Sequence, residues 1–570
     1  MRWLIPHENL QLANRFTREL GVPLLVGRLL AGRGFTDLDQ ATRFLNPQLD
    51  HLHDPFLMQD MAAAVARLKR AIDLKEKILI YGDYDVDGTM AVVVLLTALE
   101  SLGACVESYI PDRLTDGYGM QARVVEQAAQ AGARVIVSVD TGIREHEVLR
   151  RMKELGIDGI VTDHHLPEDS LPEARAILNP HRADCAYPEK NLAGVGVAFK
   201  LAQALLPPSI SQAVIRSYLK LVAIGSIADV VPLTGENRAI AHFGLAGLTE
   251  SALSAPAAAS GRAGISALLA VAGLQGQKIT AGDVAFRIAP RLNAAGRMES
   301  ARRVIDLFQT PAHGGAHEIA MGLDELNRAR QRMEDEMICA VQEQMKAQPE
   351  KAARTTLLFV GEGWHRGVIG IVAQRVVDLF YRPVLVLSAQ DGMAHGSGRS
   401  IRGFHLLNAL TQSRGLLTRF GGHAQAAGFS LPVSRIQQLE EEFERYARSV
   451  LGPADLEPQL RVDAAINLGD LTEDLCAGLK RLEPFGCGNP TPVFAAEGDL
   501  VSPPRILKEK HLKLCVKGPG RSFDAIGWRM ASRAAKLAGT KRVALAFSVS
   551  ENTFQGCTDM QLVLKDIRPA

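Results

Sequence analysis

Residues Ile78-Leu-Ile-Tyr-Gly-Asp83-Tyr-Asp85-Val-Asp87-Gly88 decide the fold of this chain. The first four form an apolar run of the length of a buried strand, and three aspartates follow it closely. A helix is expected from about 90 to 102. A buried strand, a polar turn and a helix in succession are typical of a parallel sheet.

The same pattern continues along the next part of the chain. Further strands are predicted at 106–110, 134–139 and 158–162, with helices over 121–130 and 144–155 between them. Continuous apolar strands that alternate with helices indicate a parallel sheet covered on both faces.

A helical region and a second α/β region follow. Apolar residues near one face of 319–345 predict one long helix, which we interpret as a structural spacer. Strands are then expected at 356–360 and 383–387, followed by a charged helix over 434–450 with Ser434 as its N-cap.

The last part of the chain, from 459 onward, has short alternating stretches such as 511–516 and 543–549 between Gly/Pro turns. This pattern predicts a small β-barrel. We therefore expect an α/β multidomain protein. Its expected parts are an N-terminal segment (1–50), a catalytic domain with the parallel sheet (51–240), a helical connector ending in the long helix (241–350), a smaller α/β domain (351–452) and an OB-type β-barrel (453–570).

Composition excludes several classes of protein. The 570 residues include seven scattered cysteines without a Cys-x-x-Cys pair, so neither a disulfide framework nor a thiolate zinc site is expected. No apolar run approaches the roughly 18 residues that span a bilayer, and the first residues do not read as a secretory signal. We expect a cytoplasmic protein without a membrane partner. The net charge of +1 means that any nucleic acid must bind to a local basic groove.

Acidic residues follow several apolar runs. Besides the aspartates after 78–81, Asp140 follows the strand expected at 134–139, and Asp163-His164-His165 follows the one at 158–162. Asp229 follows the apolar run 221–228, which we interpret as a further strand. Ligands of open parallel sheets bind at the carboxyl ends of the strands, so these side chains should converge.

Such convergence needs a compensating cation, because gathered carboxylates repel one another. Oxygen ligands with one or two imidazoles suit Mn²⁺ or Mg²⁺, and two such ions can serve a phosphoryl transfer. The competing interpretation is structural: a lone aspartate after a strand is usually a helix cap, and Asp87 could be one. Capping does not explain all four positions together.

Four segments resemble the signature motifs of the DHH phosphoesterase superfamily, in that family's order. They are Asp83-Tyr-Asp-Val-Asp-Gly88, Val139-Asp-Thr-Gly-Ile143, Asp163-His-His165 and Ile227-Ala-Asp-Val-Val-Pro232. The resemblance implies two metal ions, Mn²⁺ or Mg²⁺, and the metal ligands that it implies are Asp83, Asp85, Asp87, Asp140, His164 and Asp229. It further implies that Asp163 orients the histidines and that His165 binds the scissile phosphate or acts as an acid.

The remaining motifs narrow the resemblance within the superfamily. Gly396-Ser-Gly-Arg-Ser400 and Gly421–Gly428 resemble the DHH-associated (DHHA1) substrate domain. Ala289–Arg297 and Leu482–Pro490 resemble the branch of single-strand-specific DNA exonucleases. This branch implies 5′→3′ removal of mononucleotides, in DNA recombination and repair, by a monomer. The partners that it implies are single-stranded DNA, a single-stranded DNA-binding protein and a RecQ-type helicase.

The DNA-binding residues are inferred with more alternatives. Chemically, Ser397 and Arg399 form an anion site, although a tight turn explains the glycines around them equally well. The resemblance makes this segment, with Arg113, the pocket of the 5′-terminal phosphate and places His423 near the cut. The weaker candidates for lining the path of the DNA strand are Arg291, Arg297 and Arg402. Phe485 and Trp528 are candidates for stacking on bases, but burial in a core is the preferred interpretation of both.

Two other functions compete with the exonuclease. One is a small-substrate DHH phosphoesterase that acts on short oligonucleotides or bisphosphorylated nucleosides; such enzymes generally lack a β-rich tail. The other is a non-catalytic DNA-binding scaffold, which would have lost metal ligands.

Overall fold

The computed structural model describes residues 1–6, 9–113, 116, 117, 119–207, 209, 212–254, 263–554 and 557–570. It divides into two compact units. The larger unit comprises 52–232 and 239–457, and the smaller one joins 1–51, 233–238 and 458–570. Among the described residues, no helix has both the length and the apolar character needed to cross a membrane.

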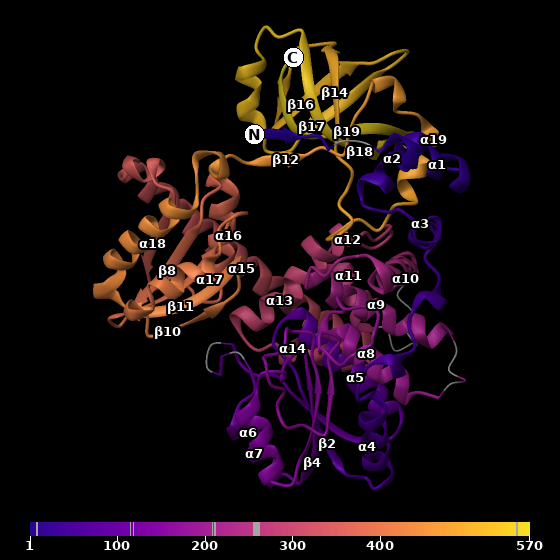
Figure 1. Ribbon diagram of the computed structural model, residues 1–570, viewed down its shortest axis with the longest axis vertical. Coiled ribbons are helices and arrows are strands. Elements are labelled where there is room, and N and C mark those ends of the chain that lie inside the picture. Colours follow the sequence, from indigo (N-terminus) through magenta and orange to yellow (C-terminus); the bar gives the residue numbers. More distant parts are fainter. Residues whose placement is uncertain are drawn as a thin grey trace. The chain divides into compact units, whose positions relative to one another are not determined.

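The larger unit begins with a five-stranded parallel sheet in the order β3-β2-β4-β5-β6 (Figure 1). Its strands are β2 (Lys77–Tyr81), β3 (Cys105–Tyr109), β4 (Ala133–Val139), β5 (Asp158–Thr162) and β6 (Ala176–Leu178). The four strands predicted from apolar runs are confirmed to within one or two residues. Since β2 and β4 are neighbouring parallel strands, the acids that follow them lie together at the carboxyl ends of the strands.

Helices cover both faces of this sheet. On one face pack α6 (Ala122–Gln130) and α7 (His146–Glu154), through residues such as Val125 and Leu149. The other face is covered by α4 (Met61–Asp73), α5 (Val86–Ser101) and α8 (Gly194–Leu205). Helix α9 (Gln212–Ala228) packs against α5 and α8. A parallel sheet sandwiched between helices is therefore confirmed.

Two local predictions for this domain are wrong. The run 221–228 is the last part of helix α9, not a strand, so Asp229 follows a helix. Almost every residue there is buried, and a helix buried on all sides has the same continuous apolar pattern as a buried strand. Helix α5 begins at Val86 rather than near 90, because the Asp85 side chain accepts a hydrogen bond from the Gly88 N–H and caps the helix.

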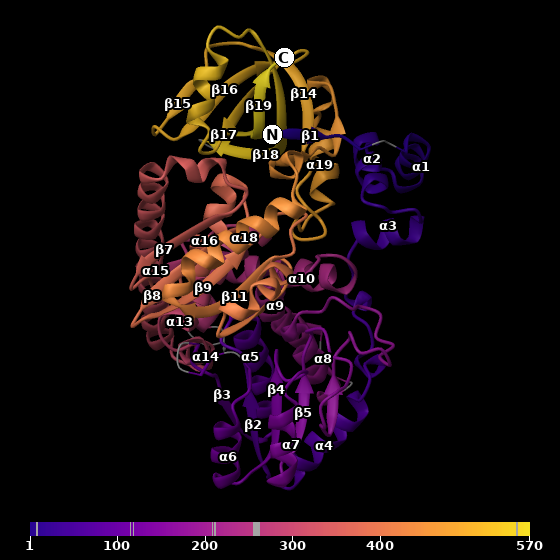
Figure 2. The same ribbon diagram turned by 60° about the vertical axis from the view of Figure 1, so that its left-hand side comes forward.

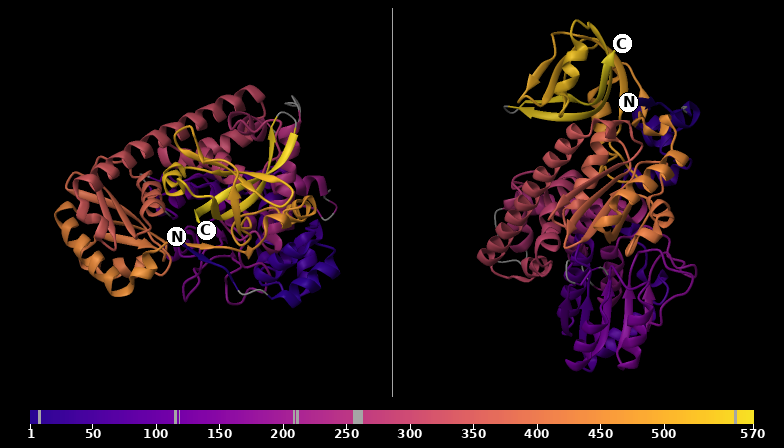
Figure 3. Two further views of the ribbon diagram at one scale, coloured as in Figure 1. Left: turned by 90° about the horizontal axis from the view of Figure 1, so that it is seen from above. Right: turned by 90° about the vertical axis from the view of Figure 1, so that its left-hand side faces the viewer.

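A helical region leads to the second sheet. It consists of α10 (Gly235–Leu253), α11 (Ala263–Val271), α12 (Ala281–Asp283), the π-helix η3 (Val284–Ile288), α13 (Ala289–Met298), α14 (Arg302–Gln309) and α15 (His313–Ala347). Helix α15 is the predicted long helix, and Figure 3 shows its length from above. Its buried face carries Asp324, Asn327, Arg330 and Glu334 beside apolar residues.

The second sheet has the strand order β10-β11-β9-β8-β7 (Figure 2). Its strands are β7 (Leu357–Glu362), β8 (Val384–Gln390), β9 (Met393–Arg399), β10 (Arg419–Gly422) and β11 (Ala426–Pro432), with helices α16 (Ile369–Phe380), α17 (Leu406–Gln412) and α18 (Ile436–Val450). The predicted strands and charged helix are present. The predicted N-cap Ser434 is wrong: it lies within a 3₁₀ turn (Val433–Arg435), and α18 starts after Arg435.

The smaller unit combines both ends of the chain. Helices α1 (Leu10–Leu20), α2 (Leu24–Gly32) and α3 (Leu38–Leu45) share a core with the C-terminal sheet. Strand β1 (Arg2–Leu4) pairs in parallel with β12 (Gln459–Arg461), and the Trp3 indole donates to Asp566 at 2.9 Å. Both termini therefore lie beside this sheet (Figure 1).

The C-terminal sheet has seven strands. They are β13 (Ala464–Ala465), β14 (Phe494–Leu500), β15 (Arg505–Leu507), β16 (His511–Lys517), β17 (Ser522–Gly527), β18 (Arg542–Phe554) and β19 (Cys557–Pro569), with α19 (Glu473–Lys480) before β14. Strand β14 pairs with both β18 and β16, so the pairings β14-β18-β19-β17-β16 return to β14 and form a closed ring.

Candidate metal centre and nucleic-acid site

The first acidic loop is shaped by glycines at both of its ends. A side chain on Gly82 would meet the Val92 side chain at 2.4 Å, and one on Gly88 would meet the Asp83 carbonyl at 2.6 Å. The loop is therefore drawn tightly against α5, with Asp83 and Asp87 buried and Asp85 half-buried. Burial, and then the charge of Asp85, raise the pKa of Asp83 to about 8.

Asp140 lies at the end of β4 in a strained conformation. Its φ of 60° is left-handed, which is uncommon for a residue other than glycine and occurs at functional sites. Its Oδ1 is buried and has no hydrogen-bond partner within the described part of the chain. Burial, and then Asp87, raise the pKa of Asp140 well above its ordinary value. A buried, unpaired carboxylate oxygen of this kind fits a metal ligand.

Asp163 fixes both histidines. Its Oδ1 accepts hydrogen bonds from the His164 N–H (2.7 Å) and the His165 N–H (3.1 Å) and lies 2.7 Å from His165 Nδ1. Its Oδ2 accepts from the Ile143 N–H at 3.0 Å. Burial raises the pKa of Asp163, but the His165 contact and these hydrogen bonds outweigh it and keep the pKa low. Asp163 is thus an anion that orients the imidazole of His165.

His164 lies between carboxylates from three segments of the chain. Its Nε2 is 3.2 Å from Asp140 Oδ1 and 3.8 Å from both Asp87 Oδ2 and Asp229 Oδ2. Burial lowers the pKa of His164 to about 4, so the ring is neutral and can offer a lone pair to a metal. Burial raises the pKa of Asp229 to about 7.

Helix α8 completes the site with residues that the sequence motifs did not single out. The N–H groups of Gly194 and Val195, at its first turn, donate to the Asp87 carboxylate at 2.6 and 2.8 Å. A Cβ on Gly194 would lie 2.5 Å from Asp140 Oδ1, so this position excludes a side chain. The glycines of Gly194-Val-Gly196, which open an apolar helix, are the signal that could have identified it.

The predicted ligands therefore gather at one edge of the sheet. Three groups of residues each bring their ligand atoms within 4.8 Å of one another. They are Asp83, Asp85 and Asp140; Asp87, His164 and Asp229; and Asp140, His164 and His165. Asp140 is shared, so the arrangement suits two neighbouring cations. Carboxylates with imidazole are donors that Mn²⁺ accepts, and a cation would offset the mutual repulsion of the buried acids.

Basic residues gather beside this acidic edge. The Arg113 guanidinium lies over the Tyr84 ring at 4.9 Å. Burial lowers the pKa of Arg297 to about 10, with a further lowering contribution from the charges of Arg113, Arg330 and Arg399. Neighbouring cations repel one another, so their gathering favours a bound anion.

A further basic residue of this group, Arg399, comes from the second sheet. Arg399 donates to the Ser397 hydroxyl at 3.1 Å. Gly370, in the first turn of α16, leaves room for both: a Cβ there would lie 3.0 Å from Ser397 Oγ and 3.1 Å from Arg399 Nη2. Backbone N–H groups at a helix N-terminus add to an anion site.

The weaker candidates are distributed differently. Arg291 donates to Asp324 at 2.9 Å and to the Arg287 carbonyl, so its charge is already engaged. Arg402 is exposed in the loop after β9. Phe485 packs against the C-terminal core, whereas Trp528 is 57% exposed with its edge toward His511, so burial is wrong for Trp528.

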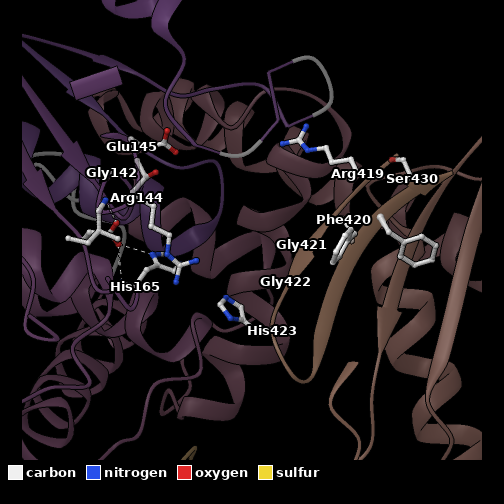
Figure 4. Close-up of a pocket in the computed structure, with 15 residues that line it drawn as sticks. Gly142, Arg144, Glu145, His165, Arg419, Phe420, Gly421, Gly422, His423 and Ser430 are labelled. Carbon is white, nitrogen blue, oxygen red and sulfur yellow. Dashed lines mark hydrogen bonds and ion pairs between the residues drawn. The ribbon is translucent and has the colours of Figure 1, made fainter. Parts of the chain in front are cut away.

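A pocket of about 570 Å³ opens beside the histidines (Figure 4). Arg144, Glu145 and His165 lie on one side, and Arg419, His423 and Ser430 lie on the facing sheet. The predicted phosphate contact His423 thus lies across the pocket from His165. Sequence motifs did not identify Arg144 or Arg419.

Residues 77–226 match the DHH family, N-terminal domain, residues 353–449 the DHHA1 domain and residues 462–566 the RecJ OB domain. The single-stranded-DNA-specific exonuclease RecJ of Bacillus subtilis (strain 168) is 37% identical over 570 residues, which cover 99% of this chain and 70% of that protein. The chain belongs to the RecJ family. The RecJ of Escherichia coli (strain K12) is 35% identical, with 96% of each chain covered.

Solved structures agree with this membership. The crystal structure of RecJ from Thermus thermophilus in complex with Mn²⁺ matches with a TM-score of 0.84 and 30% identity, and covers 100% of this chain and 79% of that one. The complex of the same protein with Mg²⁺ matches with a TM-score of 0.77 and 28% identity, and covers 100% and 78%.

Proposed function

We propose that the chain is a 5′→3′ exonuclease that degrades single-stranded DNA to 5′-mononucleotides. The observation that carries this proposal is that Asp140, whose buried Oδ1 has no hydrogen bond among the described residues, belongs to two groups of potential metal ligands. The charges of Arg113, Arg297 and Arg399 lie close to one another nearby. A two-cation site beside an anion pocket suits hydrolysis of a phosphodiester near a phosphorylated end. The names of the RecJ relatives, single-stranded-DNA-specific exonucleases, support the choice of substrate.

Two Mn²⁺ or Mg²⁺ ions would be held by the ligands predicted from the sequence, and Asp140 belongs to two of the groups of ligand atoms. Those ligands are Asp83, Asp85, Asp87, Asp140, His164 and Asp229. When bound, the ions polarise the scissile phosphate and lower the pKa of the attacking water. The two N–H groups of α8 hold Asp87 in place, and Asp163 turns His165 so that its Nε2 can donate to a phosphate oxygen.

The polarity follows from the basic pocket. Arg113, Arg297, Ser397 and Arg399 would bind the 5′-terminal phosphate, with the bidentate geometry that arginine offers to phosphate. The scissile phosphate, one nucleotide further on, then lies at the metal ligands and His423. An enzyme that binds the 5′-terminal phosphate and cleaves at the next phosphate releases the terminal residue as a mononucleotide.

The parts of the chain would divide the work. Residues 51–240 carry the metals, 351–452 hold the 5′ end, 241–350 connect them, and 453–570, with 1–50, bind the strand beyond the cut. The match of 462–566 to the RecJ OB domain favours long strands over the small substrates of other DHH phosphoesterases. RecJ membership also supports a cytoplasmic monomer that works with a single-stranded DNA-binding protein and a RecQ-type helicase in recombination and repair.

Substitution of the shared ligand tests the proposal. Asp140→Asn and His164→Ala should lower Mn²⁺-dependent release of nucleotides from single-stranded DNA by at least about 1,000-fold, on the order of the effect of removing a catalytic group. Asp169→Asn, an exposed acid of the same domain, is the matched control and should be as active as the unaltered protein. Full activity of Asp140→Asn would contradict the proposal, whereas an unaltered protein that binds single-stranded DNA without releasing nucleotides would favour a scaffold.

A further inference from the structure

The open face of the second sheet presents three rows of residues that cross β9, β11 and β10. Residues paired in register project from the same face of a sheet. Strands β9 and β11 pair along their whole length, and the His423 N–H donates to the Ala426 carbonyl at 2.8 Å. The rows are Arg399–Ala426–His423, then Ser397–Gly428–Gly421, then His395–Ser430–Arg419.

The middle row contains two glycines that the fold itself does not need. A Cβ on Gly421 would meet no atom within 4 Å, and one on Gly428 would meet only the Gly396 carbonyl, at 4.0 Å. Neither has a left-handed φ. By contrast, Gly422 has a φ of 142° and a Cβ there would lie 2.4 Å from the Ala426 carbonyl. Gly421 and Gly428 therefore leave a bare backbone floor without a packing reason.

The pocket beside the histidines lies directly over this floor (Figure 4). Gly421 and Gly428 line it, with Arg419 and Ser430 beyond them and Arg144 on the facing wall. The Arg144 guanidinium is held by two hydrogen bonds to the Leu166 carbonyl, at 2.8 and 3.0 Å. The wall is therefore fixed, and the volume of about 570 Å³ is open space above glycines.

The proposed positions of two phosphates determine what this space must hold. The 5′-terminal phosphate belongs at Arg399 and the scissile phosphate at His423, which are the two ends of the first row. The terminal sugar then lies above Ala426, and its base must project along the strands. The middle row, two residues or about 6.8 Å further along, offers the open floor in that direction.

We infer that this pocket receives the base of the 5′-terminal nucleotide, which lies flat on the backbone at Gly421 and Gly428. The inference rests on the proposed exonuclease function and names a subsite of it. Aromatic rings cover glycines in β-sheets in the same way when a side chain supplies the ring. Contact with the face of a base does not depend on its identity, so the pocket accepts all four bases.

The volume of the pocket extends the substrate class to altered bases. Pockets of about 300–1,000 Å³ hold drug-sized ligands, so this one has room for a base with a bulky substituent. The terminal residue can therefore be a damaged nucleotide, and the enzyme removes it without first distinguishing it from a normal one.

Three 5′-phosphorylated single strands test the inference. They end in thymidine, in a baseless tetrahydrofuran residue, and in deoxyuridine with a bulky C5 substituent, and KM and kcat are measured for each with Mn²⁺. The variant is Gly428→Val, which raises the floor at a position where strands favour β-branched residues. The matched control is Gly415→Val, an exposed glycine of the same domain with no atom within 4 Å of its Cβ.

The unaltered protein should digest all three strands. Gly428→Val should raise KM about 10-fold for the thymidine strand, within the range of a lost base-stacking contact, and should reject the bulky base. Its KM for the baseless strand should stay within about twofold of the control, because that strand has no base to lose the contact. Gly421→Ala, a smaller change, should shift KM in the same direction if Gly428→Val does not fold.

Other results would overturn the inference. Equal changes of KM for the thymidine and baseless strands would mean that the floor contacts the sugar–phosphate backbone. No change for any strand would mean that the base lies elsewhere. Failure of the unaltered protein to release nucleotides from any strand would contradict the proposed function itself, and the base pocket with it.

Discussion

Replacing Gly194 by alanine should weaken metal binding although no metal ligand is substituted. A Cβ at this position would lie 2.5 Å from Asp140 Oδ1 and 2.7 Å from Asp140 Cβ, whereas ordinary contacts begin near 3.4 Å. The Asp140 carboxylate must therefore move by about 0.9 Å, and metal–ligand distances tolerate only about 0.2 Å. Changes to groups that orient a ligand lower metal affinity by about 10- to 100-fold, and we expect this range for Gly194→Ala.

Isothermal titration of Mn²⁺ into metal-stripped protein measures this loss. Gly196→Ala is the control: it lies two residues further along the same helix, and its Cβ would meet the movable Leu192 side chain at 3.2 Å. We expect Gly196→Ala to bind Mn²⁺ as the unaltered protein does. Gly194→Ala with unaltered Mn²⁺ affinity would refute the assignment of Asp140 as a shared ligand.

Three further predictions concern other parts of the chain. Arg399→Gln should lower kcat/KM for 5′-phosphorylated strands by about 10- to 100-fold, as expected for a lost charged hydrogen bond, and change it less than about twofold for 5′-hydroxyl strands. Burial raises the pKa of Glu444, but hydrogen bonds from Thr355, Thr356 and Arg448 outweigh burial and lower the pKa below 4.5. The ionised Glu444 therefore stabilises the fold above pH 4.5, and this stabilisation is lost as the pH falls through the lowered pKa. Melting curves should show that Glu444→Gln is less stable than the unaltered protein at neutral pH, with a smaller difference in acid. Trp528→Ala should raise KM several-fold for long strands and leave dinucleotides unaffected, and equal effects on both would exclude a stacking role for this exposed indole.

The sequence predicts the catalytic sheet well because apolar runs and buried strands coincide there. Strand β2 begins one residue before the predicted start and β5 has the predicted bounds. The apolar pattern fails where a helix and a strand share it. The run before Asp229 has the pattern of either element, and it is helical because it is the last part of the longer helix α9. Local capping also escapes the pattern, as the early start of α5 at Asp85 shows.

The acids of the site could be predicted because each follows an element that ends at the same edge of the sheet. The parts that could not be predicted depend on contacts across the chain. The Gly194 N–H reaches Asp87 over 107 positions, and the glycines that open α8 do not indicate which acid they contact. The bare floor at Gly421 and Gly428 is likewise invisible in sequence, since these glycines resemble turn residues until the strand register places them side by side.

Metal-dependent 5′→3′ digestion is tested most directly with single-stranded DNA labelled at its 5′ end, incubated with Mn²⁺ or with a chelator. We predict that the labelled 5′-phosphate end is released as a mononucleotide with Mn²⁺, that a blocked 5′ end stops the reaction, that a blocked 3′ end does not, and that matched duplex is not digested. Release that starts at the 3′ end would contradict the assignment of Arg113, Arg297, Ser397 and Arg399 to the 5′-phosphate, and release that continues in the presence of chelator would contradict the metal centre.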